Sequence, residues 1–282
     1  MLMYRNPLIN LVLLFLTLTS VIEGENLPFI YDFFPYPEEF LQTGFHPDNL
    51  QIGIDGREYM MDTQSKTICV KEGEKIKWSG GFGFEEDEFI TPVSTAYSNL
   101  SLFVLDQSQS KLTEFDSNLN LVSSFALNIN YPDLLLFNHL NETVIFSNSE
   151  QALFKYRYDF RTKQTMIDIN QYPQVSGEVM SISISDDGTI GLLTAYPDAV
   201  SFFNLSGRYN RSVQPFIEEP RWLFTVNSKW IVFNGSGAYY FLDSSEDVKS
   251  IPIHNIHFMT KKNSILYALS LEGYYKLYLK EY

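Results

Sequence analysis

Residues 181–207 read SISISDDGTIGLLTAYPDAVSFFNLSG, and this stretch decides the fold class. Two apolar runs, SISIS and TIGLLTA, flank the polar tripeptide Asp186-Asp187-Gly188. Because glycine accepts a positive φ at little cost, this pattern predicts a β-hairpin. A third run, AVSFFN, follows a short polar turn and extends the predicted hairpin to three strands.

The same order of strand, turn and strand recurs six times along the chain. The second strands of the six segments read REYMMD, LSLFVLD, ETVIFSN, TIGLLTA, KWIVFN and SILYALS. They end at Asp62, Asp106, Asn148, Ala195, Asn234 and Ser270, with a mean spacing of about 42 residues, which is typical of four-stranded propeller blades. A β-sandwich also has many short strands, but it lacks a sixfold repeat of this length. The sequence therefore predicts an all-β protein, a six-bladed β-propeller of four-stranded antiparallel blades.

The second segment carries a more specific pattern, GGFGFEEDEFITPVSTAYSNLSLFVLDQSQSKLTEFDSNLNLVSSF over residues 80–125. Its markers are Phe89, Pro92, Val104, Asp106 and a third strand that ends at Phe115 and Asp116. This segment resembles an NHL repeat, although Gln109 and Lys111 stand where that family usually has Asn and Arg. The other five segments match by period alone. The resemblance implies a six-bladed NHL-like or TolB-like propeller, a fold that hosts many unrelated functions.

The N-terminus has the features of a secretory signal peptide over residues 1–24. Arg5 precedes the apolar run LINLVLLFLTLTS, and the small residues Ser20 and Gly24 follow. This apolar run is too short to favour a membrane span, with an uncleaved anchor as the alternative. We therefore expect a secreted or periplasmic protein with no membrane span after signal cleavage.

Residues 25–49 are aromatic and proline-rich, and we expect them to form an ordered lead-in that packs on a propeller spanning residues 50–282. The alternative is a loose linker. The last segment supplies three expected strands, near 255–259, 263–269 and 273–279. Because a blade normally has four strands, we expect residues 27–34 (LPFIYDFF) to supply the fourth and to close the ring.

Charge and cysteine usage exclude several functions. The net charge of −14 disfavours binding to nucleic acids and to anionic membrane surfaces, because both need a basic face. Cys69 is the single cysteine, so no intramolecular disulfide can form. It lies in the run TICVKEG, where a buried hydrophobic role is the simplest interpretation, and we expect no thiol-dependent activity.

No metal or cofactor site is predicted. Of the four histidines only His254 and His257 are close, and a spacing of three would place them on opposite faces of a strand. The acidic run Glu85–Glu88 lacks the spacing of a calcium loop and is expected to be solvated. We interpret Asp62, Asp106 and Asp243 as turn residues that bind local backbone groups.

No catalytic residue is predicted either, and no nucleophile motif occurs. The glycine-rich stretch SGGFGF at 79–84 lacks the lysine of a phosphate loop. Trp78, Phe82 and Phe84 could line a binding surface or pack between blades.

Two functions therefore stay open. The favoured one is an exported, non-enzymatic binding or scaffold protein whose partner is a protein or another envelope or extracellular ligand. The alternative is a propeller hydrolase, lactonase or lyase that acts through a central metal. Such an enzyme needs acidic ligands on the inner strands, yet acids occur mainly at the ends of these strands, at Asp55, Asp133 and Glu178.

Overall fold

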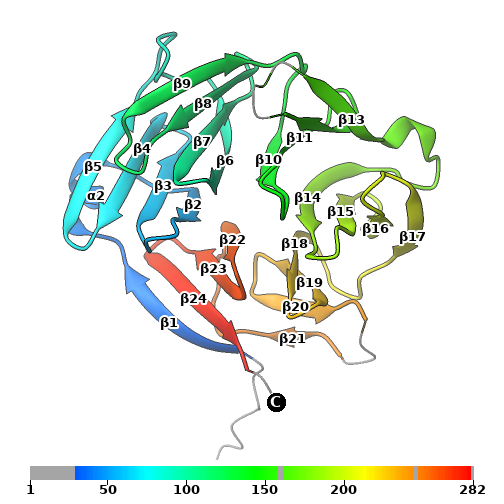
Figure 1. Ribbon diagram of the computed structural model, residues 1–282. Coiled ribbons are helices and arrows are strands. Elements are labelled where there is room, and N and C mark those ends of the chain that lie inside the picture. Colours follow the sequence, from blue (N-terminus) through cyan, green and yellow to red (C-terminus); the bar gives the residue numbers. More distant parts are fainter. Residues whose placement is uncertain (1–28, 158–159, 161, 244–246, 281–282) are drawn as a thin grey trace, which may run out of the picture.

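The structure, a computed structural model, describes residues 29–157, 160, 162–243 and 247–280. Its strands form six sheets of four antiparallel strands each, arranged around a central axis (Figure 1). The predicted six-bladed β-propeller is confirmed. The predicted signal peptide, residues 1–24, lies outside the described residues.

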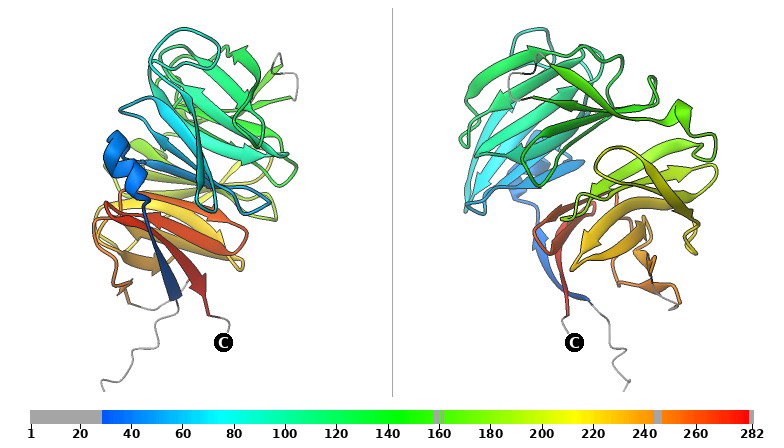
Figure 2. Two further views of the ribbon diagram at one scale, coloured as in Figure 1. Left: turned by 90° about the vertical axis from the view of Figure 1, so that its left-hand side faces the viewer. Right: turned by 45° about the vertical axis from the view of Figure 1, so that its right-hand side comes forward.

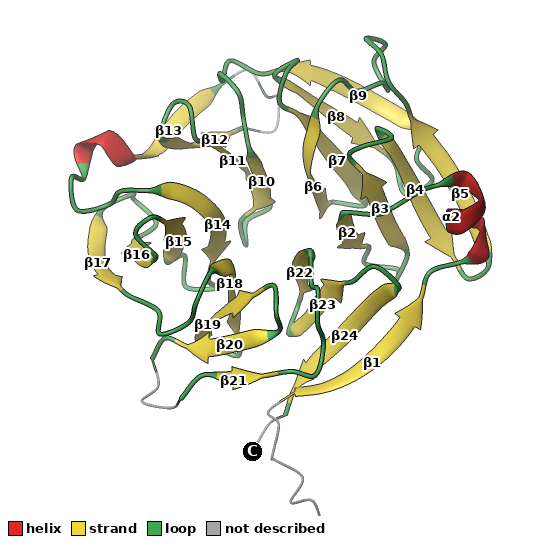
Figure 3. Cartoon of the chain, turned by 180° about the vertical axis from the view of Figure 1, so that it is seen from behind, coloured by secondary structure: helices red, strands yellow, loops and turns green. Residues whose placement is uncertain are grey.

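Each blade runs from an inner strand at the axis to an outer strand at the rim (Figure 3). Blade 1 contains β2 (Asn49–Ile52), β3 (Glu58–Asp62), β4 (Thr67–Glu72) and β5 (Lys75–Gly80), and blade 2 contains β6 (Pro92–Ser98), β7 (Ser101–Asp106), β8 (Lys111–Phe115) and β9 (Leu121–Ala126). Blade 3 contains β10 (Leu134–Phe137), β11 (Thr143–Ser147), β12 (Ala152–Tyr156) and β13 (Lys163–Asp168), and blade 4 contains β14 (Glu178–Ile184), β15 (Ile190–Ala195), β16 (Ala199–Phe203) and β17 (Tyr209–Val213). Blade 5 contains β18 (Pro220–Val226), β19 (Lys229–Asn234), β20 (Ala238–Phe241) and β21 (Lys249–Ser250), and blade 6 contains β22 (Phe258–Lys262), β23 (Ile265–Leu269), β24 (Gly273–Leu279) and β1 (Phe29–Pro35).

The second strands are mostly buried and have apolar centres because neighbouring blades cover both of their faces. Every residue of β11 and β15 is buried. The hydrophobic core consists of clusters that lie between adjacent blades, for example one that joins Val144 of blade 3 to Leu192 of blade 4. Burial on both faces explains why these strands read as continuous apolar runs.

The N-terminal strand β1 completes the last blade. It pairs antiparallel with β24 from Phe29 opposite Leu279 to Pro35 opposite Gly273. The sequence placed this strand at residues 27–34, close to the observed bounds. Gly273 is needed here, because a Cβ at this position would lie 2.3 Å from the Phe34 carbonyl oxygen.

The rest of the lead-in packs on blade 1. A short helix, α2 (Glu38–Thr43), buries Phe40 against Phe45, with ring centroids 4.8 Å apart. Trp78 of β5 packs on Phe45 at 4.9 Å and donates from Nε1 to a Glu39 carboxylate oxygen at 3.0 Å. Trp78 therefore has a packing role. The only other described helix is a single 3₁₀ turn, η1 (Ile169–Gln171).

The antiparallel order gives the ring two different faces (Figure 2). The segments between blades and the turns between second and third strands lie on one face, which we call the connection face. The turns between first and second strands and between third and fourth strands lie on the other, which we call the hairpin face. The connection-face segments are 36–48, 63–66, 81–91, 107–110, 127–133, 148–151, 169–177, 196–198, 214–219, 235–237, 251–257 and 270–272.

One expected strand boundary was wrong. The inner strand of blade 6 begins at Phe258, whereas the sequence placed it at residues 255–259. Ile256 is buried in the connection and donates its backbone N–H to the Gly235 carbonyl at 2.9 Å. Contacts with blade 5 thus hold residues 255–257 away from the axis.

Candidate functional site in the central channel

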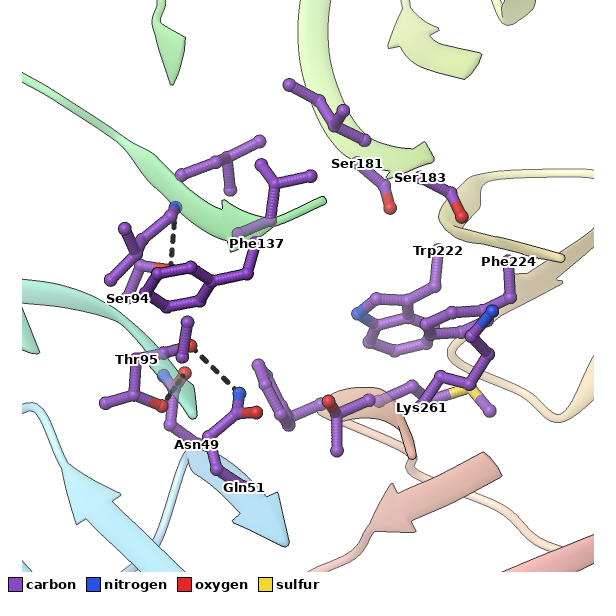
Figure 4. Close-up of a pocket in the computed structure, with 18 of the residues that line it drawn as sticks. Asn49, Gln51, Ser94, Thr95, Phe137, Ser181, Ser183, Trp222, Phe224 and Lys261 are labelled. Carbon is purple, nitrogen blue, oxygen red and sulfur yellow. Dashed lines mark hydrogen bonds between the residues drawn. The ribbon is translucent and has the colours of Figure 1, made fainter. Parts of the chain in front are cut away.

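The inner strands of all six blades surround a cavity of about 480 Å³ at the axis (Figure 4). This volume lies in the range of small-molecule and peptide side-chain sites. The labelled lining residues in Figure 4 are Asn49, Gln51, Ser94, Thr95, Phe137, Ser181, Ser183, Trp222, Phe224 and Lys261. The lining therefore combines hydroxyl, amide and aromatic groups, and aliphatic side chains such as Leu135, Met180 and Met259 complete it.

Two serines connect the inner strands of neighbouring blades. Ser94 Oγ accepts from the Leu135 backbone N–H at 3.1 Å, and Ser181 Oγ accepts from the Leu223 N–H at 3.0 Å. An inner strand is a sheet edge, so half of its backbone groups have no partner within the blade. The two serine oxygens accept hydrogen bonds from such backbone N–H groups, and each serine hydroxyl hydrogen can still be donated to a ligand.

Amide side chains make the same kind of connection between blades 1 and 2. Gln51 Nε2 donates to the Thr95 carbonyl at 2.9 Å, and Thr95 Oγ1 lies 3.4 Å from Asn49 Oδ1. The dashed lines in Figure 4 mark hydrogen bonds of this set. Asn49 and Thr95 are buried, so this corner of the channel is held in one geometry.

Lys261 is the one basic or acidic side chain among the described residues that line this cavity. Its Nζ donates to the Thr225 carbonyl at 2.7 Å and to Thr225 Oγ1 at 3.1 Å. Burial lowers the pKa of Lys261, and the carboxylate of Asp186 opposes this shift. The ammonium thus lies in a weakly solvated site beside Trp222 and Phe224 (Figure 4), with one further proton to donate.

A second cavity, of about 650 Å³, opens on the hairpin face and shares Tyr97, Phe137, Ile184 and Lys261 with the first. Its remaining charged and titratable lining residues are His139, Asp186, Asp187 and Lys262. Lys262 Nζ lies 5.5 Å from the centre of the Tyr97 ring, and burial lowers its pKa. The two cavities form one channel with a polar mouth of mixed charge.

The acids at the inner-strand ends do not converge. Asp55 lies on the hairpin face, where its carboxylate is 3.2 Å from Arg57 Nε. Asp133 lies on the connection face and accepts from Gln107 Nε2 at 2.8 Å and from the Asn148 N–H. Glu178 begins β14 on that same face and is exposed. Among the described residues no group of three or more His, Cys, Asp or Glu side chains could hold a metal ion.

The predicted turn residues have mostly the expected roles. Asp62 accepts from the N–H groups of Gln64 and Ser65 at 2.9 and 3.1 Å. Asp106 accepts from the Gln109 N–H at 2.9 Å. For these two residues the prediction is confirmed. Asp243 also lies in a turn after β20, and its carboxylate forms an exposed ion pair at 3.0 Å with Arg211.

The remaining candidates have structural or solvated positions. Cys69 is fully buried, and burial raises the pKa of its thiol. His254 and His257 lie in the connection before β22, not in a strand, and His257 Nε2 is 3.0 Å from the Pro47 carbonyl. Glu85 and Glu86 are exposed, as expected for the acidic run.

The residue patterns in the sequence did not single out Lys261, Trp222 or Phe224 as channel residues. The expected inner strand of blade 6 ended at residue 259, so Lys261 fell outside the residues considered for the channel. The paired lysines Lys261 and Lys262, directly before the polar turn Asn263-Ser264, are the signal that could have located it.

No family model matches the sequence, and no curated protein matches it. Solved structures do match the fold, including selenomethionine-substituted virginiamycin B lyase from Staphylococcus aureus, with 12% identity over 82% of this chain and 80% of that chain and a TM-score of 0.62. YCF48 bound to a D1 peptide matches with 7% identity over 90% and 96% of the two chains and a TM-score of 0.58. A nidogen/laminin complex matches with 11% identity over 72% and 79% and a TM-score of 0.55.

The chain is a six-bladed β-propeller. Structural similarity at these low sequence identities establishes the fold and leaves the activity open. Among the described residues, no helix has both the length and the apolar character that a membrane span requires.

Proposed function

We propose that this propeller is an exported, non-enzymatic binding or scaffold protein whose central channel holds part of a protein or peptide ligand. The chemistry of the channel lining carries this proposal. Hydroxyls, amides and aromatic rings surround a single ammonium, and this set can recognise a ligand by hydrogen bonding and apolar contact. YCF48 with its D1 peptide and nidogen with laminin support a protein or peptide as the partner class.

Lys261 is the proposed anchor of the ligand. A carboxylate or carbonyl oxygen of the ligand would accept from its remaining Nζ proton, and charge-assisted hydrogen bonds of this kind are among the strongest. Trp222 and Phe224 lie beside the ammonium and would contact the apolar part of the ligand (Figure 4).

Peptides selected on the purified protein from a random display library test this proposal. Binding of the selected peptides is measured by calorimetry for the natural protein and for Lys261→Met. We expect the substitution to weaken binding by about tenfold, since one charge-assisted hydrogen bond is lost. The matched control is Lys77→Met on the exposed rim of blade 1, where Lys77 donates to Asn120 at 2.8 Å. Equal affinity for both variants would contradict the channel site.

The pH dependence of binding gives a second measurement. Burial lowers the pKa of Lys261, so its ammonium loses its proton at a lower pH than an exposed lysine. Affinity for a carboxylate ligand should therefore fall as the pH rises toward the ordinary lysine pKa. This loss of affinity should already be measurable at pH values below the ordinary lysine pKa. A Lys261→Arg variant should keep its affinity over this range, because arginine stays protonated.

An enzyme with a metal on the axis is the second candidate, and the fold similarity to virginiamycin B lyase keeps it open. It is the weaker proposal, because Asp55 lies at one end of the channel and Asp133 and Glu178 at the other. Measuring calcium and zinc in the purified protein separates the two functions. A stoichiometric metal would favour the enzyme.

Export is part of the proposal and rests on the signal-peptide pattern of residues 1–24. We expect N-terminal sequencing of the exported protein to find a start near residue 21 or 25. Intact chain in the membrane fraction would instead indicate an uncleaved anchor.

We also infer an NHL-like relationship for blade 2. Gln109 and Lys111 stand at the positions that deviate from the family pattern, yet both bind the segment that leads into the blade. Gln109 Nε2 donates to the Gly83 carbonyl at 3.0 Å, and Lys111 Nζ donates to the Glu85 carbonyl at 3.1 Å.

A further inference from the structure

Among the described residues, the exposed aromatic side chains lie on the connection face, apart from Tyr31 and Phe33 on the outer strand β1 at the rim. The connection-face segments carry five of them, between 62% and 92% exposed: Phe82, Phe84, Tyr131, Tyr196 and Phe216. In the described turns of the hairpin face, the large exposed hydrophobic residues are all aliphatic, such as Ile54, Leu100 and Leu140. Single exposed apolar residues are common, but here the exposed aromatic residues of the two faces gather on the connection face.

The loop that carries Phe82 and Phe84 is held in place by the body of blade 2. Gln109 Nε2 donates to the Gly83 carbonyl, and the fully buried Phe89 anchors the end of the loop. Because the loop is fixed by these contacts, the two phenylalanines do not fold back onto the core. A binding surface that is already ordered loses little conformational entropy when a partner binds.

The connection face is also strongly acidic. Its segments, all of them described, contain thirteen aspartate and glutamate residues and a single lysine, Lys66. Glu85 and Glu86 lie beside Phe84 in the sequence, and Glu218 and Glu219 follow Phe216 closely. The negative potential therefore surrounds the exposed rings.

A groove on this face combines both properties. It has a volume of about 700 Å³ and lies between blades 5 and 6. Glu218 and Glu219 line one part of it together with Arg221, and Leu271, which is 78% exposed, lines another. The groove offers an apolar contact next to two carboxylates.

We propose that the connection face binds a lysine- and arginine-rich segment of a partner protein, a surface distinct from the central channel. Lysine and arginine side chains have apolar stems that pack on aromatic rings and charged ends that pair with carboxylates, so they match both features of the face. Electrostatic attraction over the whole face would also speed the encounter. Nucleic acids and anionic membranes carry the same sign of charge as this face and are repelled. The acids are spread over several segments, which suits an extended basic chain better than a single cation.

The test uses a fluorescein-labelled dodecapeptide with alternating basic and apolar residues (lysine, arginine, leucine and proline) and a second peptide in which glutamate replaces every basic residue. Binding is measured by fluorescence anisotropy at low salt on the full mature protein. The connection-face variants are Phe82→Ser with Phe84→Ser, and Glu218→Gln with Glu219→Gln. The matched hairpin-face variants are Leu100→Ser with Leu140→Ser, and Glu72→Gln with Glu74→Gln at the turn between β4 and β5. All eight positions are exposed, so each variant should keep the melting temperature of the natural protein.

We expect the basic peptide to bind and the acidic peptide not to bind. Each pair of connection-face substitutions should weaken binding of the basic peptide by about tenfold. Binding should also weaken when salt is raised, since surface charge pairs are screened. The hairpin-face pairs should change the affinity by less than about twofold. The proposal is wrong if the basic peptide fails to bind, if the acidic peptide binds equally well, or if the hairpin-face pairs have the larger effect. None of these outcomes depends on Lys261, so the proposed channel site stands or falls separately.

Discussion

In four of the six blades, the residue that ends the second strand (Asp62, Asp106, Ser147 or Asn234) binds the segment that leads into its blade. Asp62 accepts from the His46 N–H at 3.0 Å, and Asn234 Nδ2 donates to the Glu218 carbonyl at 3.0 Å. Asn148 Oδ1 accepts from the N–H of Val179 at 3.3 Å, in the next blade. Blade 4 has Ala195 at this position, and there the chain approaches so closely that a Cβ on Gly177 would lie 2.3 Å from the Ala195 carbonyl oxygen. This polar contact thus recurs in blades 1, 2, 3 and 5.

Asp106 is the most buried example, and its removal should be costly. Its carboxylate accepts from the N–H groups of Ile90 and Thr91 at 2.6 and 3.0 Å, and it is fully buried. Asp106→Ala leaves buried donors without a partner, so we expect the free energy of unfolding to fall by about 3 kcal/mol. Urea unfolding measures this change. Asp187→Ala, at an exposed turn, is the control and should cost less than about 1 kcal/mol; similar losses for both variants would contradict the anchoring role.

At the scale of elements, β1 has the largest structural role for its length. It covers the free edge of β24 and brings Phe29 into the core beside Phe233 and Tyr239, with ring centroids 5.9 and 5.2 Å away. Without it, the last blade would have three strands and an open, largely apolar edge. Open edges of this kind favour aggregation.

Removal of residues 25–36 should lower the melting temperature sharply and promote aggregation, which differential scanning fluorimetry and light scattering would detect. The single substitution Phe29→Ala tests the packing alone and should cost about 3–5 kcal/mol, because a large buried ring is lost. Phe33, which is 43% exposed on the same strand, gives the matched control. If the truncated protein melts like the natural one, the closing role of β1 is refuted.

For the whole molecule, closure joins the two ends of the described chain in one blade without a covalent bond. A buried network adds to this closure: Tyr274 of blade 6 donates to the carboxylate of Glu58 in blade 1, which Lys71 approaches at 3.0 Å. Burial, reinforced by Glu58, raises the pKa of Tyr274, so this hydroxyl keeps its proton. Every blade then contacts two neighbours, and no blade has a free side at which unfolding can begin.

We therefore expect the ring to unfold in one transition, with the same midpoint in every blade. Variants that retain only Trp78, in blade 1, or only Trp222, in blade 5, report by fluorescence on two blades that blade 6 separates. Tyr274→Phe should lower both midpoints together, at a cost of about 1–3 kcal/mol for the unpaired Glu58. Two separate midpoints would show that the ring opens blade by blade.

The repeat length and the apolar second strands were sufficient to predict an all-β, six-bladed propeller. Each blade is a local unit whose turns and strands follow from neighbouring residues, so the pattern is readable in a single segment such as 181–207. The turn roles of Asp62 and Asp106 were predictable for the same reason. The helix α2 and the late start of β22 were not, because contacts with other blades decide them.

The channel and the two faces were decided by the tertiary structure alone. Lys261, Trp222 and Ser94 are far apart in the sequence, and ring closure brings them to one axis. Phe82, Tyr196 and Phe216 likewise come from different segments, and only the antiparallel order of the strands places them on one face. Strand patterns depend on neighbours two residues away, whereas a site in a propeller depends on the radial position and direction of six separate strands.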